Sequence, residues 1–280
     1  MILRPSRNRK LFDVIMKIVS GLASFIGILF LTWILFEVVR KGAGALNISF
    51  FTELTSPAGI AGGVANAIIG TVLITLLAAL IGVPAGLFAG VYLSEFGSYS
   101  RLGSLVRFSI NVMIGVPSII VGLFVYTILV LPFKHFSGYA GAAALAIIMM
   151  PVAARTTEDM LNLVPNSLKE SALALGTPRW RTTLGIVFRA AKTGLITGVL
   201  LAVARVSGET APLLFTAMNS QYWPKSLNEP TANLTITIFN YAMSPYADWQ
   251  EKAWGASLLI MTGVLLLTIL ARILAKEAKK

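Results

Sequence analysis

Arg205 and Glu209 lie four residues apart in the stretch ARVSGETAPLLFT, which is otherwise apolar or small and is flanked by long apolar runs. Side chains with this spacing share one face of a helix. A guanidinium binds oxyanions through a planar fork of N–H donors, while a nearby carboxylate orients the fork and lowers the local net charge. Charged side chains inside apolar helices mark transport pathways by default. The pair therefore predicts a polar pathway through the membrane.

A second interpretation makes the same pair structural. Gly194 and Gly198 have the spacing typical of closely packed membrane helices, so the ion pair would only hold two spans or two chains together. Ser207 and Thr210 are weaker pathway candidates, because hydroxyls in apolar helices often bond back to the backbone. The sequence leaves both interpretations open, and we favour the pathway.

The composition shows which elements must position this pair. Hydrophobic residues make up 56% of the 280 residues, charged residues make up 12%, and the mean hydropathy is +0.79. A soluble chain could not bury that much apolar surface, so the sequence predicts an all-α integral membrane protein, because helices satisfy their own backbone in lipid. Its six predicted spans are Val14–Val39, Val64–Leu93, Ile110–Leu131, Tyr139–Ala154, Gly194–Met218 and Gly255–Leu274.

The basic residues predict the orientation of these spans. The net charge of +11 would suit nucleic acid, but in a membrane protein a basic excess collects in cytoplasmic segments, and we predict no nucleic-acid partner. Most of the 23 Lys and Arg residues fall at the two chain ends and in alternate loops. We therefore expect both termini, and the long loop at residues 155–193, to be cytoplasmic. The absence of cysteine excludes disulfides and Cys-ligated metals.

The long cytoplasmic loop has helix signals of its own. Ser167 and Glu170 form a capping-box pattern, Gly176 supplies a left-handed stop, and Thr177 followed by Pro178 suits the start of a second helix. These signals predict a helical hairpin at 167–189. An amphipathic hairpin on the lipid headgroups is one interpretation, and a DNA-reading helix-turn-helix is a remote third.

The hairpin residues resemble a known family signature. Glu170-Ser171-Ala172, then Gly176 and Ile186 at the expected intervals, resemble the EAA loop of ABC-importer permeases, although Phe188-Arg189 replaces its closing Leu-Pro. In that family the hairpin couples the permease to a cytoplasmic ATPase. The resemblance implies a type I importer transmembrane domain at 64–274, preceded by a first span and external segment at 1–63 and followed by a cytoplasmic tail at 275–280.

Several stretches narrow the resemblance to the A-type permease subunits of the phosphate-specific transport (Pst) system. They are GGVANAIIGTVLIT (62–75), GVPSIIVGLFVYTI (115–128), FSGYAGAAALAI (136–147), RTTEDMLNLVP (155–165) and ARVSGETAPLLFT (204–216). The resemblance implies a phosphate importer of the bacterial cytoplasmic membrane. Its implied partners are a second related permease, a pair of ATPase subunits, an extracytoplasmic phosphate-binding protein and membrane lipid.

Missing motifs agree with this division of labour. The sequence has no P-loop, zincin or nucleophile-elbow motif, so we predict no catalytic residue, cofactor or metal site in this chain, and hydrolysis of ATP by a partner. His135 is expected in a solvated loop. Glu158 and Asp159 are expected at a cytoplasmic helix end, in solvent or against the ATPase. The alternatives are a permease for another oxyanion, such as molybdate or sulfate, and a stand-alone secondary transporter that uses the Arg–Glu pair for proton coupling.

Overall fold

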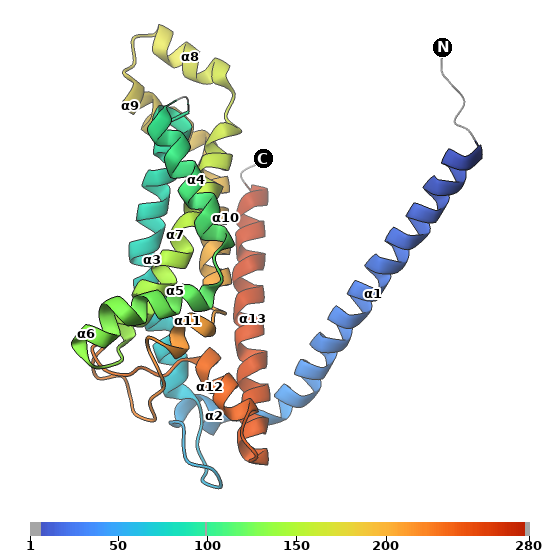
Figure 1. Ribbon diagram of the computed structural model, residues 1–280, viewed down its shortest axis with the longest axis vertical. Helices are drawn as coiled ribbons and strands as arrows, with labels where there is room; N and C mark the ends of the chain where they lie inside the picture. Colours follow the sequence, from blue (N-terminus) through green and yellow to red (C-terminus); the bar gives the residue numbers. More distant parts are fainter. Residues whose placement is uncertain (1–6, 99, 278–280) are drawn as a thin grey trace.

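The computed structural model describes residues 7–98 and 100–277, and every regular element within them is helical (Figure 1). Residues 1–6 and 278–280, which belong to the predicted cytoplasmic ends, lie outside this description. The α-helices are α1 (Arg7–Ala45), α2 (Ile48–Thr52), α3 (Ala65–Val91), α4 (Arg101–Gly115), α5 (Ser118–Val125), α6 (Leu131–Phe133), α7 (Gly138–Asn162), α8 (Asn166–Ala174), α9 (Arg179–Thr182), α10 (Phe188–Val206), α11 (Ala211–Leu214), α12 (Leu234–Ala242) and α13 (Ala247–Glu277). Short π-helical segments at Tyr92–Phe96, Tyr126–Val130 and Thr183–Val187 continue or join these helices.

Helices α3 and α7 form the centre of the bundle. They pack closely because glycines on α3 face the backbone of α7: a Cβ at Gly86 would lie 2.6 Å from the carbonyl oxygen of Met150. Gly82 and Gly90, four residues to either side, make the same kind of approach. Small residues at this spacing let membrane helices come close enough for dispersion contacts. A buried apolar cluster between α3, α7 and α10 holds these three helices together.

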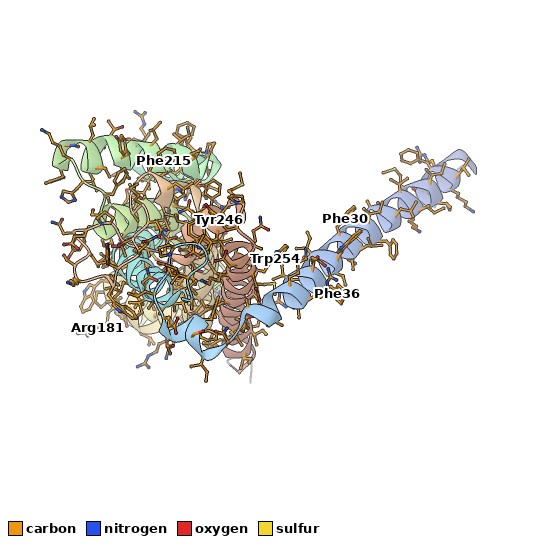
Figure 2. The ribbon with its side chains drawn as sticks, turned by 90° about the horizontal axis from the view of Figure 1, so that it is seen from below. Phe30, Phe36, Arg181, Phe215, Tyr246 and Trp254 are labelled. Atoms are coloured by element: carbon orange, nitrogen blue, oxygen red, sulfur yellow. The ribbon has the colours of Figure 1, made fainter. Side chains whose placement is uncertain are left out.

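Helix α1 diverges from the bundle. Its C-terminal end contacts α13 near Trp254, Phe30 and Phe36 lie along its middle part, and its N-terminal part runs away from the other helices (Figures 1 and 2). None of its most apolar 18-residue window is buried within the chain, as expected for a helix surrounded by lipid or by another subunit. Among the described residues, five helices are long and apolar enough to cross a membrane, with a sixth if α4 and α5–α6 form one bent span.

The predicted third span, Ile110–Leu131, is wrong as a single straight helix. The chain bends by 102° between α4, which ends at Gly115, and the helical segment that begins at Ser118. Pro117 causes the bend, because its ring disfavours helical geometry at the preceding residue, and Val116 is accordingly extended, with φ −72° and ψ 128°. The segment after the bend lies across the bundle (Figure 1).

Two other predicted spans have different ends. The fourth, Tyr139–Ala154, continues as α7 to Asn162, where Arg155 pairs with Glu158 and Asp159 at helical spacing and supports the extra turns. The fifth begins earlier than predicted, since one helix runs from Arg179 to Val206, and it stops well before Met218.

Candidate functional site

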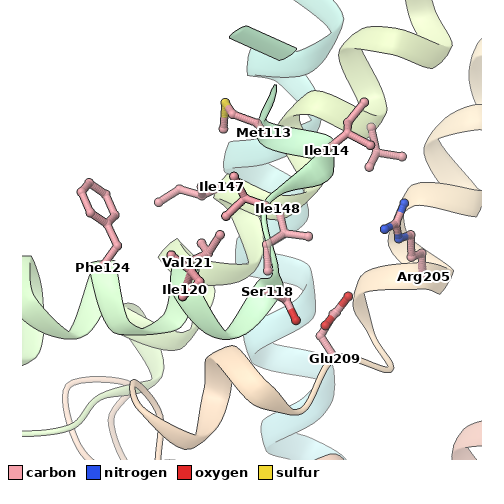
Figure 3. A pocket seen from close by; sticks show the side chains of 12 residues that line it. Met113, Ile114, Ser118, Ile120, Val121, Phe124, Ile147, Ile148, Arg205 and Glu209 are labelled. Carbon is pink, nitrogen blue, oxygen red and sulfur yellow. The ribbon is translucent and has the colours of Figure 1, made fainter. Parts of the chain in front are cut away.

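A cavity of about 360 Å³ opens where the α4–α5 bend faces α7 and the end of α10. Most of its lining is apolar, and Arg205 and Glu209 are the charged side chains among its lining residues (Figure 3). The lining residues are Met113, Ile114, Val116, Ser118, Ile120, Val121, Phe124, Ile147, Ile148, Val152, Arg205 and Glu209. The bend in the predicted third span is therefore one wall of the site.

The end of α10 determines where the two charged groups lie. Arg205 is in the last turn of the helix, and the chain then leaves helical geometry through Ser207 and Gly208 before Glu209. The carbonyl of Glu209 accepts a hydrogen bond of 2.9 Å from the hydroxyl of Thr235, at the start of α12. The same hydroxyl lies 2.8 Å from the side-chain oxygen of Asn233 and can donate to either acceptor, so the contact links the turn that carries Glu209 to the start of α12.

The expectation that Arg205 and Glu209 share one helix face is wrong, because the helix ends between them. The turn still brings both side chains to the same cavity, with the guanidinium and the carboxylate at different heights along its wall (Figure 3). Among the described residues, no ion pair joins the two groups. Pro212 lies in the first turn of the new helix α11 and does not interrupt α10.

The two hydroxyl candidates do not line this cavity. The Ser207 hydroxyl donates to the carbonyl of Ala204 at 2.8 Å, which is the backbone bond that made it a weak candidate. Thr210 precedes α11, where its carbonyl accepts from the first turn of that helix. The structure adds Ser118, whose hydroxyl points toward the same space as the Glu209 carboxylate (Figure 3). The available sequence signal was Pro117, which directly precedes α5 and places Ser118 as the first residue of that helix, at the bend.

The predicted helical hairpin is present as α8 and α9. Gly176 turns the chain between them with φ +80°, in the left-handed region, as expected. The predicted caps are wrong: α8 begins one residue before Ser167, after Pro165, and α9 follows Pro178, so neither Ser167 nor Thr177 caps a helix.

The residues predicted to couple the chain to an ATPase differ in how far they are exposed to solvent. Ala172 is buried inside the hairpin, whereas Glu170 and Ser171 are exposed, beside a strongly exposed Leu175. An ion pair of 2.6 Å between Lys169 and Glu95 ties the hairpin to the end of α3. The hairpin therefore exposes Glu170 and Ser171, while the ion pair of Lys169 anchors it to the rest of the chain.

Of the remaining titratable candidates, Glu158 differs most from expectation. It is almost fully buried and its carboxylate lies 2.7 Å from the guanidinium of Arg107, so a solvated position is wrong, while Asp159 is exposed. His135 is half-buried, with Nδ1 3.3 Å from the carbonyl of Phe136. Within the described part of the chain, no cluster of three or more His, Cys, Asp or Glu could hold a metal ion.

Comparison with known proteins gives the family. Residues 82–280 match the family described as "Binding-protein-dependent transport system inner membrane component". The chain is 50% identical to the phosphate transport system permease protein PstA of Pasteurella multocida (strain Pm70), over 97% of each chain. It is 36% identical to the probable PstA of Methanocaldococcus jannaschii, over 90% of each. This chain belongs to the PstA permease family. As a member, it is a multi-pass inner membrane permease component and not the ATPase.

Solved structures confirm the fold expected for a PstA chain. A chain from the crystal structure of a bacterial alginate ABC transporter, in complex with an alginate pentasaccharide-bound periplasmic protein, matches with a TM-score of 0.68 over 97% of this chain and 98% of its own, at 15% identity. An inward-facing MetNI methionine ABC transporter matches with a TM-score of 0.58 over 77% of this chain and 94% of its own, at 18% identity. The PstA chain therefore has the fold of ABC-importer membrane subunits, as the sequence predicted.

Proposed function

We propose that this chain conducts inorganic phosphate across the cytoplasmic membrane and that the cavity holding Arg205 and Glu209 is part of its pathway. The observation that supports the proposal is that Arg205, in the last turn of α10, and Glu209, in the turn that follows, both line one largely apolar cavity. The names of the PstA relatives support phosphate as the substrate.

The two charged groups suit hydrogen phosphate in different ways. The guanidinium of Arg205 offers parallel N–H donors to two phosphate oxygens. The carboxylate of Glu209 accepts hydrogen bonds, and it therefore favours an oxyanion that keeps an O–H group at neutral pH, as phosphate does and sulfate and molybdate do not. Because Glu209 also offsets the charge of Arg205, the anion is held without being trapped.

The hairpin supports movement powered by a partner. Its exposed edge at Glu170 and Ser171, its buried Ala172 and its Gly176 turn suit docking against a cytoplasmic ATPase, which would drive alternating access. The full assembly would contain a second related permease, two ATPase subunits and an extracytoplasmic phosphate-binding protein. A stand-alone secondary transporter has no use for such a hairpin.

The orientation belongs to the same proposal. The described start of α1 and end of α13 lie at the same end of the molecule as α8 and α9 (Figure 1). If the hairpin meets a cytoplasmic ATPase, both chain ends are cytoplasmic, as the distribution of basic residues predicts.

Transport by the complete complex tests the proposal. In proteoliposomes with the binding protein enclosed, ATP added on the hairpin side should drive export of labelled phosphate toward that side. Excess sulfate or molybdate should not compete. Phosphate movement without ATP, following a proton gradient, would favour the secondary transporter, and equal competition by molybdate would favour a different oxyanion.

The hairpin turn gives a second prediction. Gly176→Val places a β-branched residue at φ +80°, which costs about 1–2 kcal/mol and should reshape the turn. We expect ATPase subunits to co-purify several-fold less well, while membrane insertion stays normal. Gly185→Val is the matched control, because a Cβ there meets open space and the backbone needs no positive φ. If ATPase subunits co-purify with Gly176→Val as well as with the unaltered chain, the hairpin is not part of the surface that docks the ATPase.

A further inference from the structure

Glu158 is the centre of a charged cluster that lies outside the cavity. Its carboxylate oxygen Oε1 accepts from Nε and lies near Nη2 of Arg107, at 2.8 and 2.7 Å. Its other oxygen lies 3.8 Å from a nitrogen of Arg155, and Arg155 in turn lies 3.3 Å from the carboxylate of Asp159. Glu158 therefore has one arginine in full contact and a second one close by.

The cluster joins the same two helices that line the cavity. Arg107 lies on α4, six residues before the lining residue Met113, and Glu158 lies on α7, six residues after the lining residue Val152. Six residues of helix span roughly 9 Å. The ion pair thus holds α4 against α7 on the hairpin side of the cavity.

Apart from the ion pair, α4 is held by one small apolar cluster, in which Ile110 packs against Leu93 and Ala154. Among its described residues only Gly103 and Ile110 are buried, while Leu102, Leu105, Phe108 and Val112 are exposed. Beyond Gly115 the chain continues through the bend into α5, the cavity wall that carries Ser118. A displacement of α4 away from α7 therefore moves this wall.

A buried carboxylate strongly resists losing its partner. Removing one member of a buried pair leaves an uncompensated charge and is far costlier than exchanging it for another partner of the same sign. Arg155 is placed for that exchange. Arg155 lies 3.3 Å from Asp159 and 3.8 Å from Glu158, and Asp159 is about half exposed, so a shift of Arg155 from Asp159 toward Glu158 costs little.

We propose that Glu158 is a partner-exchange latch for transport. In the conformation described, Arg107 holds α4 and the cavity wall against α7; when α4 moves away, Arg155 takes over the carboxylate and α4 is free. The latch rests on the proposed function, because it would control how phosphate leaves this cavity on the hairpin side. Arg107, Arg155 and Glu158 act as positioning residues and do not touch the anion.

The latch predicts opposite effects for the two arginines. Arg107→Gln removes the partner of the closed form and leaves Glu158 with Arg155. ATP hydrolysis in the absence of the binding protein should then rise by about fivefold or more, and phosphate moved per ATP should fall. Arg155→Gln removes the partner of the open form. Hydrolysis without the binding protein should stay low, and both stimulated hydrolysis and transport should fall together.

Arg101→Gln is the matched control, because Arg101 is an exposed arginine on the same helix, and it should leave both measurements unchanged. Hydrolysis that remains dependent on the binding protein in Arg107→Gln, or the same phenotype for both arginine variants, overturns the latch. If Arg107→Gln fails to assemble, Arg107→Lys replaces it as the test. A partial rise of ATP hydrolysis without the binding protein supports the latch, and hydrolysis that still requires the binding protein assigns Arg107 a structural role. The hydrolysis measurement does not depend on which anion is transported, so the latch and the phosphate proposal can fail separately.

Discussion

The double variant Arg205→Gln/Glu209→Gln is expected to assemble normally and to lose phosphate transport. Arg205 is exposed, Glu209 is only partly buried and no ion pair joins them among the described residues, so replacing both by glutamine is expected to leave the fold intact. The anion, however, loses its guanidinium. A charge-assisted hydrogen bond contributes about 1.5–3 kcal/mol, so losing this contact should slow transport by about ten- to a hundredfold.

Phosphate uptake per assembled complex is the measurement, with the amount of co-purified ATPase as the control for assembly. Arg205→Lys sharpens the result, because it keeps the charge and loses the two-pronged donor geometry, and it should also transport poorly. A double variant that transports at the normal rate would show that Arg205 and Glu209 are packing residues. That outcome would leave the family assignment intact and remove this cavity from the pathway.

Gly122→Ala should impair transport through a single added methyl group. A Cβ at Gly122 would lie 2.5 Å from Cα of Pro212, so α5 must move away from α11. Overpacking of this kind costs about 1–3 kcal/mol, partly offset by the better helix propensity of alanine. The larger effect should be on the site, because α5 carries Ser118 and α11 follows directly after the turn that presents Glu209.

The matched control is Gly115→Ala, at the end of α4, where a Cβ meets open space. Uptake per assembled complex should fall several-fold in Gly122→Ala and stay normal in Gly115→Ala. Equal uptake by the two variants would mean that the distance between α5 and α11 does not control the pathway.

The long helices could be predicted from hydropathy, but the places where helices break could not. Apolar runs located α1, α3 and α13 well, because burial in lipid and burial in protein select the same residues. Both failures occurred inside apolar runs. Around Pro117 the apolar run continues on both sides of the bend, and after Val206 it resumes within a few residues, so hydropathy does not show either break. Pro117 itself is the local signal of the first break.

The site was predicted in part for a similar reason. Arg205 and Glu209 stand out in any apolar sequence, and the structure brings them to one cavity even though the helix between them ends. The burial of Glu158 depends on Arg107, which is 51 residues away, and no local pattern indicates that contact. Partners that are distant in the chain are decided by tertiary packing, which a single sequence does not show.

The hydrogen bond between Thr235 and the carbonyl of Glu209 has a thermodynamic consequence. It closes a ring of chain across 26 residues, which contains the whole segment from Met218 to Asn233 at the end of the molecule opposite the hairpin. A partner that reshapes this segment on docking would also move the carboxylate. Linkage then requires reciprocity: by whatever factor docking changes the affinity for the anion, the bound anion changes the affinity for the docked partner.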